Sequence, residues 1–479
     1  MAHQKRLPNL LEVTFVLTSF IVIMYVFVAQ IGLPIQLALF VSWFVIMLVG
    51  LKIGYSYFDM QQGILKGINN GLEAVLVLVT VGALIGTWIA GGVVPSIIYY
   101  GLTIINPTIF LFAAFAICTV TSLATGTSFG TAGTAGIAMM GIGHSFGIPM
   151  ALVAGAVISG AYVGDKLSPL SDTTVMTASL SKVNLIDHIK SMLYVSTPAW
   201  IITGILFLLT GFFYVNGNGD LSRAEATMAA LQDHFRISWY MLVPAALVIL
   251  LLALKKPSIP TIAFGALLGS VWAYLFQGMP LLEAVRSSYS GFSIESGVEF
   301  IDNLLNRGGI VSMLEVIVLI IFALGVGGLM EQIGILQVIC NKMLAWADNA
   351  GKVTLSTVLA GFFGNFFGGA AYVSIITASK ITEKNYDRLG IDRRVLSRNT
   401  EGGGTVTTPM VPWSDGGVYM ATVLGVSTLS YLPFLWFNFL AVGITLLYGF
   451  TNKFIWYTNA EGAANRPAAK AKLTNEKTS

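Results

Sequence analysis

GAYVGDKLSPLSDTT, residues 160–174, places three charged side chains inside a segment that otherwise has the composition of a membrane span. They are Asp165, Lys166 and Asp172, and the surrounding segment runs from Pro149 to Leu180. Ionisable groups are costly in hydrocarbon, so such residues usually line a water-filled path or bind an ion. The intervening Gly, Pro, Ser and Thr residues interrupt a helix, and interrupted helices at mid-membrane form the ion sites of transporters. A solvated loop between two short spans is the alternative interpretation.

The same pattern returns once, in GTVTTPMVPWSDGG, which ends at Gly417. Aligning PLSD (169–172) with PWSD (412–415) gives an offset of 243 residues. The matches fall on residues that typically begin, end or interrupt helices, so the sequence predicts an internal duplication. Further pairs at this offset, or at one residue less, are Gly126 with Gly369, Gly147 with Gly390, Glu73 with Glu315, and Gly92 with Gly334.

The composition is that of a protein embedded in a lipid bilayer, with 55% hydrophobic and 10% charged residues. Apolar runs recur along almost the whole length, which predicts an all-α integral membrane protein. The net charge of +3 is spread over short loops and indicates no nucleic-acid partner. Cys118 and Cys340 both lie in apolar segments, where they are expected as small buried hydrophobes rather than a disulfide or metal site.

The predicted spans form two repeats of five membrane helices each, with one re-entrant hairpin and one broken helix in each repeat. Irregular backbone at this depth needs protein or water around it. The predicted parts are repeat 1 (1–215) with hairpin 107–145 and broken helix 148–181, an extracytoplasmic linker (216–236), repeat 2 (237–450) with hairpin 353–387 and broken helix 391–429, and a cytoplasmic tail (451–479). Residues 93–106 and 341–352 are expected as connecting loops.

Basic residues in the loops predict the orientation. When Lys5 and Arg6 are cytoplasmic and each hairpin returns to its side of entry, the other lysine-rich loops also fall inside, including Lys255-Lys256 and the cluster 380–394. Each repeat then crosses the membrane an odd number of times, so the two copies run in opposite directions. The sequence therefore predicts inverted-topology repeats in the cell membrane with both termini cytoplasmic.

Inverted repeats would bring the hairpin tips and broken helices together near the bilayer midplane. Oxygen ligands with one or two carboxylates suit Na⁺, which is expected at Asp165, Asp172 and Asp415. A partly dehydrated carboxylate can exchange H⁺ for a cation near neutral pH, so no resident cofactor is expected. The remaining candidates for ion or proton binding are Thr127, Ser128, Thr173, Ser414, Asn365 and Glu401, and those for a substrate anion are Lys166, Arg398, Thr407 and Thr408.

Asp165 aligns with Thr408 of the second copy, so it has no acidic counterpart and is the main candidate for the coupling carboxylate. A salt bridge to Lys166 is the alternative role for it. Asp172 and Asp415 follow Ser at predicted helix starts, where helix capping is an equally available use.

Two further kinds of acidic residue carry open alternatives. Glu401 is either a proton site or a partner for Arg398, one turn earlier. Glu73 and Glu315 lie near predicted helix ends, where a structural placement is expected.

At three stretches the sequence resembles the NhaC family of Na⁺/H⁺ antiporters, within the ion-transporter superfamily. They are GTSFGTAGTAGIA (126–138), SGAYVGDKLSPLSDTT (159–174) and EGGGTVTTPMVPWSD (401–415), and the resemblance extends from about Asn9 to Tyr457. It implies secondary-active exchange of Na⁺ for H⁺. The hairpin tips, TGTS and NFFGG, depart from the Ser-Asn-Thr that superfamily members often carry, which puts a carboxylate pocket of that type in doubt.

The same family includes exchangers of organic acids, in which malate enters against lactate. LPIQLALFVSWF (33–44), GLEAVLVLVTVGALIGTWIAGGVVP (71–95) and NRGGIVSML (306–314) look like that subgroup. A homodimer is implied by the superfamily alone.

Three functions remain to be compared: a Na⁺/H⁺ antiporter without organic substrate, an exchanger of small carboxylates coupled to Na⁺ and H⁺, and a passive channel. Two unequal inverted halves favour alternating access over a channel. The sequence carries no nucleophile–base pair or metal-ligand spacing of the kind that an enzyme requires.

Overall fold

The structure is a computed structural model that describes residues 5–218, 221–296, 302 and 305–458. Within these ranges it contains helices and an isolated β-bridge between Ile391 and Tyr457. Eight helices are long and apolar enough to cross a membrane, and the number rises to ten if two sharply bent helix pairs each count as one span. The prediction of an all-helical membrane protein is confirmed. The predicted tail beyond Thr458 lies outside the described residues.

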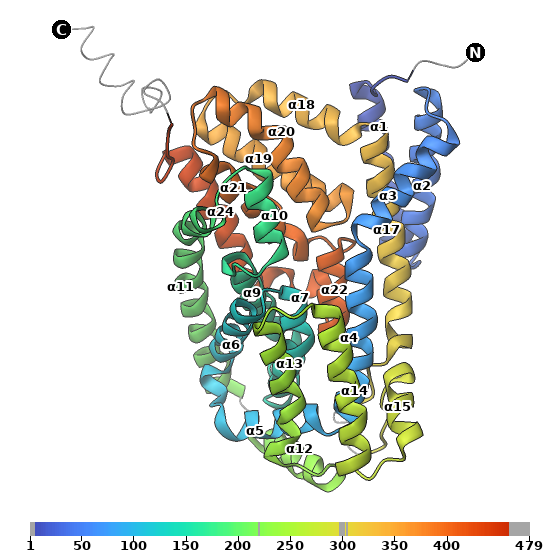
Figure 1. Cartoon of the computed structure of the whole chain (residues 1–479), viewed down its shortest axis with the longest axis vertical. Helices are drawn as coiled ribbons and strands as arrows, with labels where there is room; N and C mark the ends of the chain where they lie inside the picture. The colour runs from blue at the N-terminus through green and yellow to red at the C-terminus, as the bar shows by residue number, and fades with distance from the viewer. Residues whose placement is uncertain (1–4, 219–220, 297–301, 303–304, 459–479) are drawn as a thin grey trace, which may run out of the picture.

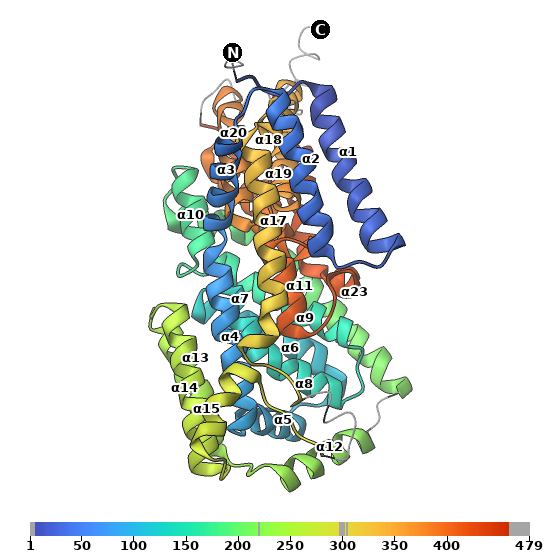
Figure 2. The same cartoon turned by 90° about the vertical axis from the view of Figure 1, so that its right-hand side faces the viewer.

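The N-terminal part forms long helices on one side of the molecule (Figures 1 and 2). They are α1 (Leu10–Met24), continued by η1 (Tyr25–Gln30), α2 (Ile35–Lys52), α3 (Tyr57–Asn70) and α4 (Leu72–Ala90). Together with α17 (Leu314–Gln332) and α18 (Ile335–Trp346), the first of these helices enclose their own apolar core. A larger core joins α4 to the middle of the chain.

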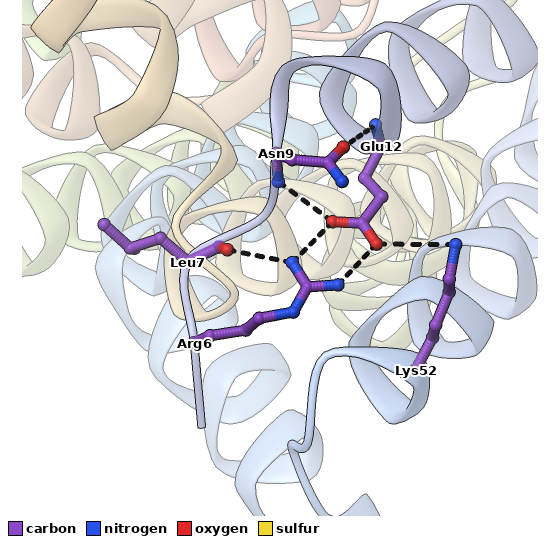
Figure 3. Close-up of polar contacts among 5 residues, drawn as sticks. All are labelled: Arg6, Leu7, Asn9, Glu12 and Lys52. Atoms are coloured by element: carbon purple, nitrogen blue, oxygen red, sulfur yellow. Dashed lines mark hydrogen bonds and ion pairs between the residues drawn. The ribbon is translucent and has the colours of Figure 1, made fainter. Parts of the chain in front are cut away.

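A cluster of charges fixes the start of α1 (Figure 3). Asn9 and Glu12 form a capping box, in which each side chain accepts the other's backbone N–H. Arg6 donates two hydrogen bonds to the Glu12 carboxylate at 2.7 and 2.8 Å, and Lys52 at the end of α2 lies 3.4 Å from it. The buried carboxylate is therefore fully compensated, and it ties α1 to α2 at the end of the molecule where both chain ends lie.

The next elements surround the centre of the molecule. They are α5 (Val93–Ile104), η2 (Pro107–Ile109), α6 (Phe110–Thr125), α7 (Ser128–Thr131), η3 (Ala132–Gly136), α8 (Ile137–Ser145), α9 (Met150–Leu167), α10 (Asp172–Leu180) and α11 (Leu185–Asn218). Glycines let α6 and α9 pack backbone to backbone, since Gly160 faces the Phe115 carbonyl and Gly164 the Leu123 amide. The break between α9 and α10 falls within the predicted broken helix.

The second half has the elements α12 (Leu221–His234), η4 (Trp239–Leu242), α13 (Val243–Ala253), α14 (Ser258–Phe276), α15 (Leu281–Ser290), η5 (Ile310–Met313), α17, α18, α19 (Ala350–Gly368) and α20 (Ala371–Arg388). It ends with α21 (Arg393–Gly403), η6 (Thr405–Met410), α22 (Asp415–Leu424), α23 (Thr428–Tyr431), η7 (Leu432–Phe434) and α24 (Trp436–Thr451). The bent pairs are 224–234 with 239–253, at 93°, and 415–424 with 428–434, at 89°.

Two predicted loops are helices instead. Residues 93–106 contain α5, and residues 341–352 contain the end of α18. Each helix follows a glycine with left-handed backbone, Gly92 at φ 74° and Gly334 at φ 80°, so the chain turns sharply and a new helix begins at once. The predicted linker is also largely helical, because α11 runs to Asn218 and α12 begins at Leu221.

Several elements of the two halves match in length and spacing. α17 begins 242 residues after α4 and has the same length, and α18 stands in the same relation to α5. Figures 1 and 2 place α5 and α18 at opposite ends of the longest axis, while the two ends of the chain lie at the same end. The side of the membrane on which the termini lie stays a prediction.

Candidate functional site: a carboxylate-lined cavity

A cavity of about 460 Å³ lies where the interruptions of the chain meet. Its walls come from the α3–α4 junction, the α6–α7 break, the α9–α10 break, the α13–α14 turn, the start of α20 and the η6–α22 segment. Both halves of the chain therefore contribute to it. The predicted site residues that line it are Thr127, Ser128, Asp165, Asp172, Thr173, Thr408 and Asp415.

Asp165 lies in the last turn of α9, which ends two residues later before Pro169. Its side chain is 4% exposed, and Oδ2 accepts a hydrogen bond from the Ser128 hydroxyl at 2.8 Å. Oδ1 has no hydrogen-bond partner in the described part of the chain. A buried carboxylate with a vacant oxygen is unusual, and the negative end of the helix dipole favours a cation beside it. The geometry therefore suits an exchangeable proton or Na⁺.

Lys166 does not pair with Asp165, although the two are adjacent in sequence. Its ammonium group is fully buried and lies 5.8 Å from the centre of the Phe437 ring. No ion pair among the described residues joins it to a carboxylate. Consecutive residues on an α-helix project about 100° apart, which places the two side chains on different faces of α9.

Asp415 is the first residue of α22 and is 4% exposed. Its carboxylate accepts from the Gly416 N–H at 2.7 Å and from the Ala371 N–H, whose distance to each oxygen is 3.3 Å. The side chain thus bridges the N-termini of α20 and α22, where a negative charge is favoured. Ser414 is the capping residue of α22, since its hydroxyl accepts from the Gly417 N–H at 3.0 Å.

Asp172 occupies the matching position at the start of α10 and also lines the cavity, but it is exposed. The Tyr372 hydroxyl, from the first turn of α20, donates a hydrogen bond to its Oδ2. Ser171 is the capping residue there, and its hydroxyl contacts that of Thr173 at 2.9 Å. The Tyr372–Asp172 hydrogen bond therefore joins α10 to α20 at the cavity.

The cavity contains further groups that the sequence interpretation did not assign to it, and two of them lie near Asp172. They are Glu73, in the first turn of α4, and Tyr372, and both line the cavity together with Asp172. The sequence predicted a structural place for Glu73 near the membrane interface. Its counterpart Glu315 does lie at the surface, where Gln36 donates to its backbone oxygen at 3.3 Å. Only the fold distinguishes the two glutamates.

Asn365 and Thr407 stabilise the irregular segment beside the cavity. The Asn365 amide donates to the Gly404 carbonyl at 2.6 Å and to the Thr407 hydroxyl at 2.9 Å, and it accepts from Thr408 at 3.2 Å. Asn365 is fully buried in the last turn of α19, not in an open hairpin tip. The structure gives this side chain a framework position, with all three contacts directed at the 404–408 backbone turn.

The predicted anion ligands Lys166 and Arg398 do not line the cavity, and neither does Glu401. Arg398 is 1% exposed, donates to the Phe454 carbonyl at 3.1 Å and lies 5.5 Å from the Trp456 ring centre. Glu401 accepts from the Thr177 hydroxyl at 2.9 Å and forms no ion pair with Arg398. The cations that do line the cavity are Lys255 and Lys256, on the α13–α14 turn.

Comparison with known proteins places these features in context. The sequence pattern of the Na⁺/H⁺ antiporter family matches residues 3–190 and 160–453. The chain is 59% identical over 453 residues to a Bacillus subtilis (strain 168) protein named malate-2H⁺/Na⁺-lactate antiporter, covering 95% of this chain and 97% of that protein. It is 36% identical over 401 residues to the Na⁺/H⁺ antiporter NhaC of Alkalihalophilus pseudofirmus, covering 84% and 86% of the two chains.

More distant similarities extend the range of named substrates. The chain is 34% identical over 420 residues to the arginine/ornithine antiporter ArcD of Halobacterium salinarum, covering 87% of each protein. Among solved structures, MtrF of Neisseria gonorrhoeae aligns with a TM-score of 0.38 and 15% identity over 94% of this chain and 96% of that one. This structural similarity is too low to establish a shared fold.

Proposed function

Because the chain belongs to the Na⁺/H⁺ antiporter family, we propose that it exchanges small organic acids, of the malate and lactate type, in steps coupled to H⁺ and Na⁺. The chain is a multi-pass secondary antiporter and not an enzyme, and the family resemblance of its three motifs is confirmed. Membership of the family does not itself identify an organic substrate, so the substrate is the proposed part. It is supported by the 59% identity to the malate-2H⁺/Na⁺-lactate antiporter, which exceeds the 36% identity to a Na⁺/H⁺ antiporter.

The observation that carries the proposal is the charge of the cavity. Four carboxylates line it, those of Glu73, Asp165, Asp172 and Asp415. Two unit charges about 4 Å apart near a protein surface interact by roughly 4 kcal/mol, so an organic anion is repelled until cations neutralise the walls. Transport of the organic acid is then coupled to transport of H⁺ or Na⁺, because the carboxylate substrate and its cations must occupy the cavity together.

The name of the Bacillus relative also pairs each substrate carboxylate with one monovalent cation. Malate has two carboxylates and is paired with two H⁺, whereas lactate has one and is paired with one Na⁺. If this chain follows that rule, each substrate carboxylate crosses with one monovalent cation, and the loaded cavity keeps a constant charge. Asp165 is the proposed coupling group because it is buried at the cavity and its Oδ1 has no hydrogen-bond partner among the described residues.

Alternating access by two inverted halves is the proposed mechanism. Its supports are the matched pairs α4 with α17 and α5 with α18, and the opposite placement of α5 and α18 along the longest axis (Figures 1 and 2). The cavity lies between interrupted helices of both halves, as in transporters in which one repeat moves against the other. The hairpins are proposed to return to their side of entry.

Exchange of Na⁺ for H⁺ without an organic substrate is the second candidate. The four carboxylates are also compatible with it, because carboxylate oxygens are hard ligands that can hold Na⁺ without an organic anion. Purified protein in liposomes separates the two functions. We expect a Na⁺ gradient to drive proton movement only when malate or lactate is present on the appropriate side, and labelled malate to exchange for lactate. Full Na⁺/H⁺ exchange in the absence of any organic acid would contradict the proposal and establish the second candidate.

A further inference from the structure

The cavity needs a group that receives the substrate carboxylate, and the predicted anion ligands lie elsewhere. We propose that Lys255 and Lys256, on the turn between α13 and α14, bind the carboxylate of the organic substrate. The proposal rests on the proposed exchange of organic acids and names the residues that select for the acid. It starts from the lining of the cavity, in which these two residues are the positively charged side chains among the described residues.

The position of the turn is the first argument. Figures 1 and 2 show α13 and α14 in the half of the molecule that lies away from the chain ends, with the turn between them about midway along the longest axis. The turn joins the bent helix pair that ends at Ala253 to the candidate span α14, which begins at Ser258. Lys255 and Lys256 are exposed and face a cavity of about 460 Å³, a volume within the range of small-molecule sites.

The backbone of the turn is the second argument. The Lys255 N–H donates to Leu252 O at 2.9 Å and the Lys256 N–H to Leu251 O at 3.0 Å, so α13 ends in a Schellman motif. Lys255 has φ 62°, at the position where such motifs usually carry glycine. The α1–α2 turn has Gly32 at φ 75° two residues before Pro34, just as Lys255 precedes Pro257 by two. Geometry alone would therefore select glycine, and lysine indicates a use for the side chain.

Comparison with Lys182 is the third argument. Lys182 ends α10 in the same motif, with φ 57°, and its ammonium group pairs with Glu383 at 2.8 Å. In contrast, none of the ion pairs between described residues involves Lys255 or Lys256. The two lysines therefore leave two positive charges at the cavity without a carboxylate partner in the described residues, and a substrate carboxylate would supply one.

The arrangement separates the tasks within one cavity. Carboxylates on α4, α9, α10 and α22 hold the cations, and the α13–α14 turn holds the anion. A small organic acid can then contact the lysines while the coupled cation contacts the carboxylates, so that the acid and the cation are recognised together. Ester or amide analogues, which have no free carboxylate, lack the contact to the lysines.

Substitutions at the turn test the assignment without endangering the fold. Lys255→Gly removes the charge and suits the left-handed backbone, and Lys256→Gln removes the second charge while keeping side-chain length. We expect the double variant to raise the KM for malate and lactate in liposome exchange by at least about tenfold, since charge-assisted bonds are lost. The KM for Na⁺ should change by less than about twofold. Lys256→Arg alone should retain near-normal affinity for both acids.

Lys182→Gly is the matched control, because it has the same backbone position outside the cavity, and its KM for the acids should be unchanged. A malate-induced rise in melting temperature of the purified protein gives a second measurement, and it should disappear in the double variant only. An unchanged KM for malate in the double variant overturns the assignment while leaving organic-acid exchange intact. Absence of any carboxylate exchange in the unmodified protein overturns both proposals.

Discussion

At the scale of single residues, the chemistry of the cavity depends on which carboxylate oxygens remain free. Asp415 accepts from two helix N-termini, and Asp172 accepts from Tyr372, whereas Asp165 has one hydroxyl donor and one vacant oxygen. Carboxylates that are already satisfied are poor competitors for a moving ion. Among the buried carboxylates of the cavity, Asp165 is therefore the residue at which a change in charge should have the largest effect.

Asp165→Asn is expected to abolish coupled exchange while leaving the protein folded. The amide keeps the shape of the side chain and can still accept from Ser128, but it neither carries a proton nor neutralises Na⁺. Exchange of malate for lactate in liposomes measures the effect, and Asp187→Asn, at an exposed position on α11, serves as the control. Coupled transport at the normal rate in Asp165→Asn would refute the assigned role.

The buried hydrogen bonds of Asn365 predict that its replacement lowers the stability of the protein. Replacement by Ala removes three buried hydrogen bonds, to the Gly404 carbonyl and to the hydroxyls of Thr407 and Thr408, although both hydroxyls keep a bond to a backbone carbonyl. Each lost hydrogen bond contributes about 0.5–1.5 kcal/mol, so the melting temperature of purified Asn365→Ala should fall by several degrees. An unaltered melting temperature would show that the 404–408 turn does not depend on this side chain.

At the scale of elements, the cavity exists because helices pack closely enough to hold their interrupted ends in register. α6 and α9 approach through glycines, and both end at the cavity, α6 with Gly126 at φ 73° and α9 with the turn that contains Pro169. Small residues at such crossings are typical of membrane helices. A displacement of α9 against α6 would separate Asp165 from Ser128.

Gly160→Ala tests this packing. A Cβ atom at Gly160 would meet the Phe115 carbonyl oxygen and the Cβ of Cys118, so the helices must move apart. We expect a loss of about 1–3 kcal/mol in stability and a lower melting temperature. Gly443→Ala in α24 is the matched control, because nothing lies within 4 Å of a Cβ there and alanine favours a helix. Equal melting temperatures for the two variants would contradict the role of the crossing.

At the scale of the whole molecule, the two halves differ in charge although several of their elements correspond. The first half supplies Glu73, Asp165 and Asp172 to the cavity, and the second supplies Asp415 and the two lysines of the α13–α14 turn. An antiporter with equal halves would present the same surface to both sides. Under the proposed exchange of organic acids, the two lysines of the second half would supply the positive charge that an anionic substrate needs.

The opposite placement of α5 and α18 predicts their accessibility in the cell. In a background without Cys118 and Cys340, single cysteines at Thr103 in α5 and Lys342 in α18 occupy exposed positions. A membrane-impermeant thiol reagent added to intact cells should label Cys at position 103, and label Cys at position 342 only after the cells are opened. Labelling of both positions from the same side would exclude inverted halves.

The sequence alone determined the elements, because apolar length and helix-breaking residues act locally. It predicted the membrane helices, the breaks near Gly126, Pro169, Gly369 and Pro412, and the carboxylates Asp165, Asp172 and Asp415 that line the cavity. It took α5 and the end of α18 for loops, because the glycines before these helices look the same whether the chain then unwinds or begins another helix.

Only the tertiary structure decided which side chains share one space. Lys166 is adjacent to Asp165 in sequence, yet the helix turns it away into a buried position beside Phe437. Glu73 and Glu315 begin helices of equal length, yet one faces the cavity and the other the surface. Lys255 and Lys256 look like ordinary loop charges until the α13–α14 turn is placed against α4 and α7. Direction around a helix and contact between distant segments are set by packing, which no local pattern in the chain specifies.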